Sequence, residues 1–174
     1  TYLEDAAAQV ITLTGSDGDG DPLTFAIASN PTRGVLGAIT PINATSASVT
    51  YTPSANENGA DSFTFTANDG QATSIPGTVS ITLTPVNDVP SFTSGGNVSV
   101  FKDSGPQTIN PWATALSAGP ANESAQTLLF NISGNTNAAL FSVQPSINAA
   151  GVLSFTGAPN SNGVATISVN VMDS

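Results

Sequence analysis

The stretch "DSFTFTAND", residues 61–69, alternates apolar and polar side chains at every second position. Successive side chains of a β-strand point to opposite faces of its sheet, so a period of two indicates a half-buried strand. Phe63 and Phe65 then point inward, and Asn68 and Asp69 end the strand. The same period and the same kind of ending recur along the chain.

Further runs of Val, Ile, Thr, Phe and Tyr alternate in this way between segments rich in Gly, Asn, Asp and Pro. They are "QVITLTG" (9–15), "PLTFAI" (22–27), "SVTYT" (48–52) and "GTVSITLT" (77–84). Helical periodicity is nearly absent, and only "PWATALSAG" (111–119) suggests a short helical turn. Short strands at this spacing predict an all-β sandwich with Val79, Ile81 and Leu83 inward.

The second half of the chain repeats the first. The aligned pairs are "YTPSANENG" (51–59) with "FTGAPNSNG" (155–163), "LTFAI" (23–27) with "LLFNI" (128–132), and "LEDAAAQVI" (3–11) with "FKDSGPQTI" (101–109). Between them, "TPVNDVP" (84–90) is typical of a linker, because Pro90 favours an extended conformation at Val89. We expect two tandem β-sandwiches, at 1–88 and at 89–174, of which the second is divergent.

The charge balance is unusual in how few charges there are. Only 8% of the residues are charged, with 2 basic and 12 acidic side chains and a net charge of −10. Nothing here neutralises phosphates, so nucleic acid is excluded as a partner. The chain has no cysteine, so a bound cation is one way to cross-link it where disulfides are absent.

The ends and the hydropathy bear on location. No apolar run approaches the roughly 20 residues of a membrane helix, so we expect no membrane insertion. The chain does not open with basic residues followed by an apolar segment, as a signal peptide does. It begins and stops within its strand pattern, so we expect it to be part of a longer protein. A surface made of Thr, Ser, Asn and Gly is typical of secreted β-rich proteins.

Three aspartates, Asp17, Asp19 and Asp21, alternate with glycines in "GSDGDGDPLTF" (15–25). Carboxylates held this close repel one another unless a cation lies between them. Calcium takes about six to eight oxygen ligands in flexible geometry, which such a turn could supply in part. The alternative interpretation is a solvated Asp-Gly turn between two strands.

The helix–loop–helix type of calcium loop does not fit this turn. Counted from Asp17, the glycine required at position six falls on Pro22, and the glutamate required at position twelve falls on Ala28. The segment also leads into a strand and not into a helix. Any further ligands must come from elsewhere in the fold.

Catalytic arrangements are poorly represented. The absence of His and Cys removes most catalytic triads and zinc sites. Pairs of carboxylates could serve glycoside hydrolysis, but the acids lie on short turns without an aromatic cleft. We therefore expect a protein that is not an enzyme.

Three motifs in order resemble bacterial cadherin-like domains, which occur as tandem repeats in large surface adhesins. "SDGDGDPLTFAI", "DSFTFTANDG" and "VSITLTPVNDVP" are similar to the family's D-x-D turn, its V-x-A-x-D strand end and its D-x-N-D-N-x-P linker. The resemblance covers 1–90 and is weaker over 91–174. It implies Ig-like, cadherin-like sandwiches on the bacterial cell surface or outside the cell. It also implies that calcium rigidifies junctions with neighbouring repeats.

The resemblance implies two sets of calcium ligands. The set at the leading end, shared with a preceding domain, is Asp17, Asp19 and Asp69, with Asp21 or Asn68 as helpers. The set at the internal junction is Asn87, Asp88, Glu4, Asp5, Glu57, Asn122, Glu123 and Asp173.

The chain departs from the family pattern at the internal junction. Pro85 stands where the linker of the family has its first Asp, and Val89 stands where it has its last Asn. In the second copy the three turn aspartates are replaced by Asn122, Ser124 and Gln126. We expect weaker calcium affinity there.

Two functions of different classes remain open. The first is a calcium-stiffened extender or adhesion module, whose partners are neighbouring repeats and other copies of the adhesin. The alternative is a carbohydrate- or partner-binding module that contacts surface glycans, for which exposed aromatic residues are expected. Aromatic residues make up only 6%, and we expect Trp112 to pack in the second core.

Overall fold

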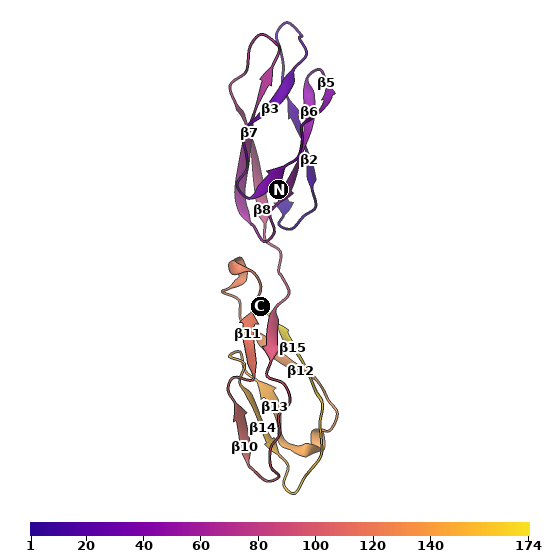
Figure 1. The fold of residues 1–174 in the computed structure, drawn as a ribbon, viewed down its shortest axis with the longest axis vertical. Coiled ribbons are helices and arrows are strands. Elements are labelled where there is room, and N and C mark those ends of the chain that lie inside the picture. Colours follow the sequence, from indigo (N-terminus) through magenta and orange to yellow (C-terminus); the bar gives the residue numbers. More distant parts are fainter. The chain divides into compact units, whose positions relative to one another are not determined.

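A computed structural model describes residues 1–174 of the chain (Figure 1). The chain divides into two compact units, Thr1–Val86 and Asn87–Ser174, and each is described by itself. Asn87 and Asp88 of the linker therefore group with the second unit. Both units consist of β-strands, which confirms the all-β fold class. None of the short helical turns has the length or apolar character that crossing a bilayer requires.

The first unit is a sandwich of two sheets. One sheet has the strand order β1-β8-β7-β3, and the other has the order β2-β6-β4 with β5 also paired to β6. The strands are β1 (Tyr2–Leu3), β2 (Gln9–Thr14), β3 (Thr24–Ser29), β4 (Gly34–Leu36), β5 (Thr40–Asn43), β6 (Ser46–Pro53), β7 (Gly59–Asn68) and β8 (Gly77–Thr84). The short β1 runs parallel to β8, which in turn pairs antiparallel with β7.

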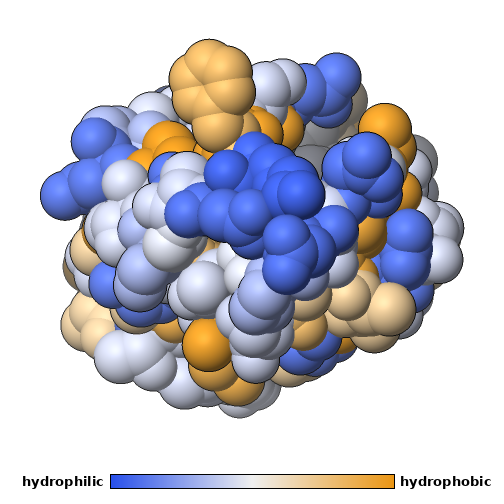
Figure 2. All heavy atoms as spheres, turned by 90° about the horizontal axis from the view of Figure 1, so that it is seen from below, coloured by the Kyte–Doolittle hydropathy of each residue, from blue (hydrophilic) through white to orange (hydrophobic).

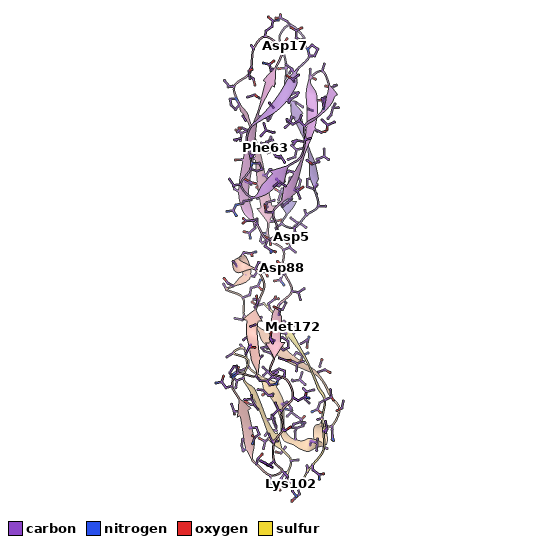
Figure 3. The ribbon with its side chains drawn as sticks, in the orientation of Figure 1. Asp5, Asp17, Phe63, Asp88, Lys102 and Met172 are labelled. Atoms are coloured by element: carbon purple, nitrogen blue, oxygen red, sulfur yellow. The ribbon has the colours of Figure 1, made fainter.

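The core of the first unit follows the alternation of the sequence. Phe63 of β7 is fully buried between the sheets (Figure 3), and Ile81 and Leu83 of β8 are buried beside it. Phe65 and Val79 are half-buried and pack against the same cluster. The inward orientation predicted for these side chains is confirmed.

A buried carboxylate holds one side of this core in place. Asp61 accepts hydrogen bonds from the backbone N–H groups of Thr32 (2.9 Å), Arg33 (3.1 Å) and Ser62 (2.9 Å) and from the hydroxyl of Tyr51 (2.8 Å). Burial raises the pKa of the Asp61 carboxyl, but these donors outweigh it and bring the pKa below its usual value. Both oxygens of this buried carboxylate thus have hydrogen-bond donors within the fold.

The second unit repeats this design with fewer paired strands. Its strands are β9 (Ser91–Ser94), β10 (Pro106–Ile109), β11 (Ala113–Ser117), β12 (Leu129–Asn135), β13 (Phe141–Ile147), β14 (Leu153–Gly157) and β15 (Ile167–Met172). They pair as β10-β14-β13, β11-β9 and β12-β15. Two 3-10 turns, η1 (Ala121–Glu123) and η2 (Ala138–Leu140), lie between strands.

The core of the second unit is formed by Ala113, Phe130, Ile147, Leu153 and Phe155. The indole of Trp112 packs against it, so the expected core position of this residue is confirmed. Figure 2 views the end of this unit that carries Lys102 in Figure 3. Hydrophilic side chains gather at the centre of that face, with apolar ones scattered around them.

The expected helical turn over 111–119 is wrong. Residues 113–117 form β11, which pairs with β9, and the helical turns lie at η1 and η2 instead. The buried side chain of Ala113 explains the difference, because it is fixed by packing in the core. Tertiary contacts outweigh the weak helical preference of an Ala-containing stretch.

The internal repeat is visible in matching turns. Asp5 accepts a hydrogen bond from the backbone N–H of Asn56 (2.9 Å), and Asp103 accepts one from that of Asn160 (2.7 Å). All four residues have positive φ, between 56° and 60°. Asn and Asp tolerate this conformation better than other residues with side chains, which accounts for their presence at the same places in both copies.

Candidate metal-binding clusters

The glycine-rich turn of the first unit is closed by its own first aspartate. Asp17 Oδ1 accepts the backbone N–H groups of Asp19 (2.9 Å) and Asp21 (3.0 Å). The N–H groups of Asp21 and Asp19 lower the pKa of the Asp17 carboxyl, against desolvation and the nearby charge of Asp69, which raise it. Figure 3 shows Asp17 at one end of the first unit. This carboxylate therefore already has donors.

The end of β7 is built in the same way. Asp69 Oδ1 accepts the N–H groups of Ala72 (2.6 Å) and Gln71 (2.7 Å), which lower the pKa of the Asp69 carboxyl. Asn68 Oδ1 accepts the N–H of Gly70 at 2.8 Å. Thr24 of β3 pairs with Asn68 of β7, so Asp69 and the turn that precedes β3 lie at the same end of the unit. The charge of Asp69 there raises the pKa of the Asp17 carboxyl.

The opposite end of the first unit carries Glu4, Asp5 and Glu57. Glu4 is 1% exposed, and its two oxygens accept hydrogen bonds from the N–H of Val86 (2.8 Å) and the side-chain amide of Asn58 (3.3 Å). Glu57 pairs with Arg33 at the surface. No three carboxylates of the first unit alone offer oxygens within 4.8 Å of one another. Glu4 and Glu57 thus make hydrogen bonds and an ion pair within the first unit itself.

The second unit gathers polar side chains from separate segments around its linker. The backbone N–H of Asp88 donates to Glu123 Oε1 at 3.0 Å. The amide of Asn87 donates to Asp173 Oδ1 at 3.1 Å and accepts from the amide of Gln126 at 2.9 Å. The linker, η1, the segment after η1 and the residue that follows β15 therefore meet at these side chains. We call these five residues the linker cluster.

Four oxygens of the linker cluster are buried without a hydrogen-bond partner. They are Asp88 Oδ2, Glu123 Oε2, Gln126 Oε1 and Asp173 Oδ2. Glu123 is only 5% exposed. Leaving a buried acceptor unpaired costs about 1–3 kcal/mol, and more for a charged group, so four of them in one cluster require an explanation.

Gly119 allows this cluster to close. A Cβ at this position would lie 1.8 Å from Glu123 Oε2 and 3.3 Å from the Cβ of Asp88. Only a residue without a side chain leaves room for both acids here. The glycine and the two acids thus form one packed arrangement.

Of the residues predicted for the internal junction, Asn87, Asp88, Glu123 and Asp173 come together in the linker cluster. Asn122 lies in η1 next to Glu123, and its side chain is exposed. Gln126 was missing from the predicted ligands. The alignment of Gln126 with Asp21 was a signal that could have identified it.

Residues 1–82 match the family model described as a bacterial Ig domain, so the first unit is a bacterial Ig-like domain. No curated protein matches the chain. Among solved structures, an endo-fucoidan hydrolase from glycoside hydrolase family 107 and a point variant of it are similar at 17% identity with a TM-score of 0.41. The similarity covers 99% of this chain but 26% of that enzyme, and it is too weak to support an inference about activity.

Proposed function

We propose that the chain is a non-catalytic, calcium-binding segment of an extracellular bacterial protein, a surface or secreted adhesin, in which calcium rigidifies the repeat array. The match to the bacterial Ig domain family supports the extracellular setting. The four unpartnered oxygens of the linker cluster support the calcium role.

The chemistry of these oxygens suits a hard cation. All four are acceptors, and three of them belong to carboxylates. Calcium binds carboxylate and amide oxygens, and its six to eight positions are readily completed by backbone carbonyls or water. A cation would also offset the repulsion between the carboxylates of Asp88, Glu123 and Asp173.

Calcium binding requires the side chains of the linker cluster to rearrange. No three carboxylates of the second unit offer oxygens within 4.8 Å of one another. Calcium would therefore draw these side chains closer or take amide oxygens, such as that of Gln126, into its shell. Flexible calcium geometry tolerates both.

Calcium at the linker cluster would stiffen the linker. Asn87 and Asp88 are already bonded to Asp173 and Glu123, and a shared ion would add a second set of bonds. A ligand that binds only the native state stabilises it by about 2.7 kcal/mol at a hundred times its Kd. The ion thus takes the cross-linking role that a disulfide has in other secreted domains.

We extend the proposal to the turn of Asp17, Asp19 and Asp69 at the other end of the first unit. Hydrogen bonds from backbone N–H groups hold the carboxylates of Asp17 and Asp69 in place, and a neighbouring repeat would provide the other ligands. We expect this site to depend on that neighbour, because the first unit does not assemble three carboxylates on its own.

The test is thermal unfolding of the 174-residue chain with millimolar calcium or with chelator. The only tryptophan, Trp112, lies in the second unit, so its fluorescence reports on that unit. We expect calcium to raise its unfolding midpoint by about 10 °C, since each kcal/mol shifts a small domain by roughly 4–8 °C. An unchanged midpoint would contradict the proposal.

The control separates binding at the cluster from a general effect of charge. Glu123→Gln should remove at least about half of the calcium-dependent shift. Asp103→Asn removes one negative charge from the same unit at an exposed turn and should leave the shift intact. Equal losses in both variants would indicate nonspecific screening.

The alternative of a carbohydrate-binding module has less support. Phe101 is the only aromatic residue among the exposed large hydrophobic side chains, whereas sugar platforms need several exposed rings. Binding of the chain to a glycan array, unaffected by chelator, would favour this alternative over the calcium-stiffened segment.

A further inference from the structure

The second unit has a free sheet edge where the first unit has a strand. In the first unit β7 lies between β3 and β8. In the second unit the equivalent strand, β15, pairs only with β12. Its outer edge therefore presents backbone N–H and C=O groups without a strand partner, an arrangement that favours pairing with a further strand.

A groove of about 810 Å³ opens along this edge. Ile167 and Val169 of β15 line it, together with the core residues Leu153 and Phe155 and the segment 96–104. Burying such apolar side chains is the main source of folding free energy, so a groove that reaches the core indicates a missing layer.

In the first unit this place is filled by β8, which lies between β7 and β1. Tyr2 and Leu3 of β1 pair in parallel with Leu83 and Thr84 of β8. Their counterparts, Val100 and Phe101, lie outside any strand, and Phe101 is 90% exposed.

A second difference lies at the start of β15. β7 begins at Gly59, where it pairs with Leu83 of β8, and spans ten residues. β15 spans six and begins at Ile167, whereas Gly163 is the counterpart of Gly59. Residues 163–166 thus correspond to the part of β7 that begins its pairing with β8 in the first unit. Both free segments border the groove.

We propose that this groove holds one further β-strand, antiparallel to β15 and parallel to 100–101, contributed by the polypeptide that continues from β15. The occupant has the alternating pattern of β8, in which Val79, Ile81 and Leu83 alternate with polar residues. The first unit supports a donor in the same polypeptide, because there β8 follows β7 through the short connection 69–76. The proposal does not depend on calcium.

The test appends residues 70–84 of the first unit after Asp173, the counterpart of Asp69. In the control, the appended copy carries Val79→Asn, Ile81→Asn and Leu83→Asn. We expect the unmodified graft to raise the unfolding midpoint of the second unit, followed by Trp112 fluorescence, by about 10 °C, since two buried apolar side chains each shift it by several degrees. Trp112 also lines the groove, so its emission should change in the native state.

Hydrogen exchange locates the added strand. We expect slower exchange of alternate backbone amides over 164–169 in the graft and not in the control. Equal midpoints and equal exchange in graft and control would overturn the proposal. The proposal would also be overturned if the chain without the graft sedimented as a dimer and these amides were already protected in it. A second copy would then fill the groove.

Discussion

The acidic turn of the first unit and the linker cluster of the second unit use their carboxylates in opposite ways. Asp17 and Asp69 each accept two backbone N–H groups and lie near solvent. Asp88, Glu123 and Asp173 each keep an oxygen that is buried without a partner. A high density of aspartates therefore does not by itself leave carboxylate oxygens without donors, whereas the linker cluster has such oxygens.

Asp61 provides a third case, which separates burial from the lack of partners. It is as buried as Glu123 but is surrounded by donors. We therefore expect the removal of a satisfied buried carboxylate to destabilise the protein whatever the calcium concentration. Removing an unsatisfied one should matter chiefly when calcium is present.

The largest effect is expected for Asp61→Ala. The substitution leaves the N–H groups of Thr32 and Arg33 and the hydroxyl of Tyr51 without their acceptor. We expect a loss of about 3 kcal/mol in the stability of the first unit, equal in calcium and in chelator. Tyrosine fluorescence during denaturation measures it, because both tyrosines lie in the first unit. A loss that depends on calcium would break the comparison.

A smaller effect is expected for Gly119→Ala. The added methyl group would overlap Glu123 Oε2 and force the linker cluster apart. We expect the second unit to lose about 2 kcal/mol, and the calcium-dependent shift to fall with it. Gly18→Ala is the matched control in the acidic turn, since a Cβ there meets nothing within 4 Å. If Gly18→Ala destabilised its unit as strongly, close packing would not distinguish the two clusters.

The effect of Glu123→Gln on the stability of the second unit should differ in sign between chelator and calcium. In chelator the variant is expected to be as stable as the original chain or more stable, because it removes a buried charge beside two other acids. With calcium it should bind at least about tenfold more weakly, a difference of about 1.4 kcal/mol. Calorimetric titration with calcium measures the affinity, and a loss of stability in chelator would show that Glu123 serves the apo fold instead.

The strands and the repeat could be predicted from the sequence because they depend on local pattern. The alternation of β7 and β8 identified Phe63, Ile81 and Leu83 as core residues. The alignment of the copies paired Asp5 with Asp103, which occupy matching turns in the structure. Backbone pairing and burial follow a period of two wherever one face of a sheet is covered.

The state of each acid could not be predicted, because it depends on which N–H groups the fold brings near it. "DGDGD" was the most suggestive motif, yet its first carboxylate is taken up by its own turn. Glu123 is offset by one position from the aligned Asp17, and its burial depends on η1 and on the space left by Gly119. Neither the turn η1 nor the space at Gly119 can be predicted from the spacing of residues in the sequence.

The smallest expected effect concerns the pH response of the acidic turn. Backbone hydrogen bonds lower the pKa of the Asp17 carboxyl, so in the folded chain its midpoint of protonation lies below the usual value of 3.8. The stability that Asp17 contributes is present above the unfolded pKa and is lost as the pH falls through the folded one. Carbon NMR of the Asp17 carboxyl should show an inflection below 3.8 in chelator, and calcium should move it little in this chain. A large downward movement with calcium would show that the turn binds the ion without a neighbouring repeat, and would remove the distinction between the two clusters.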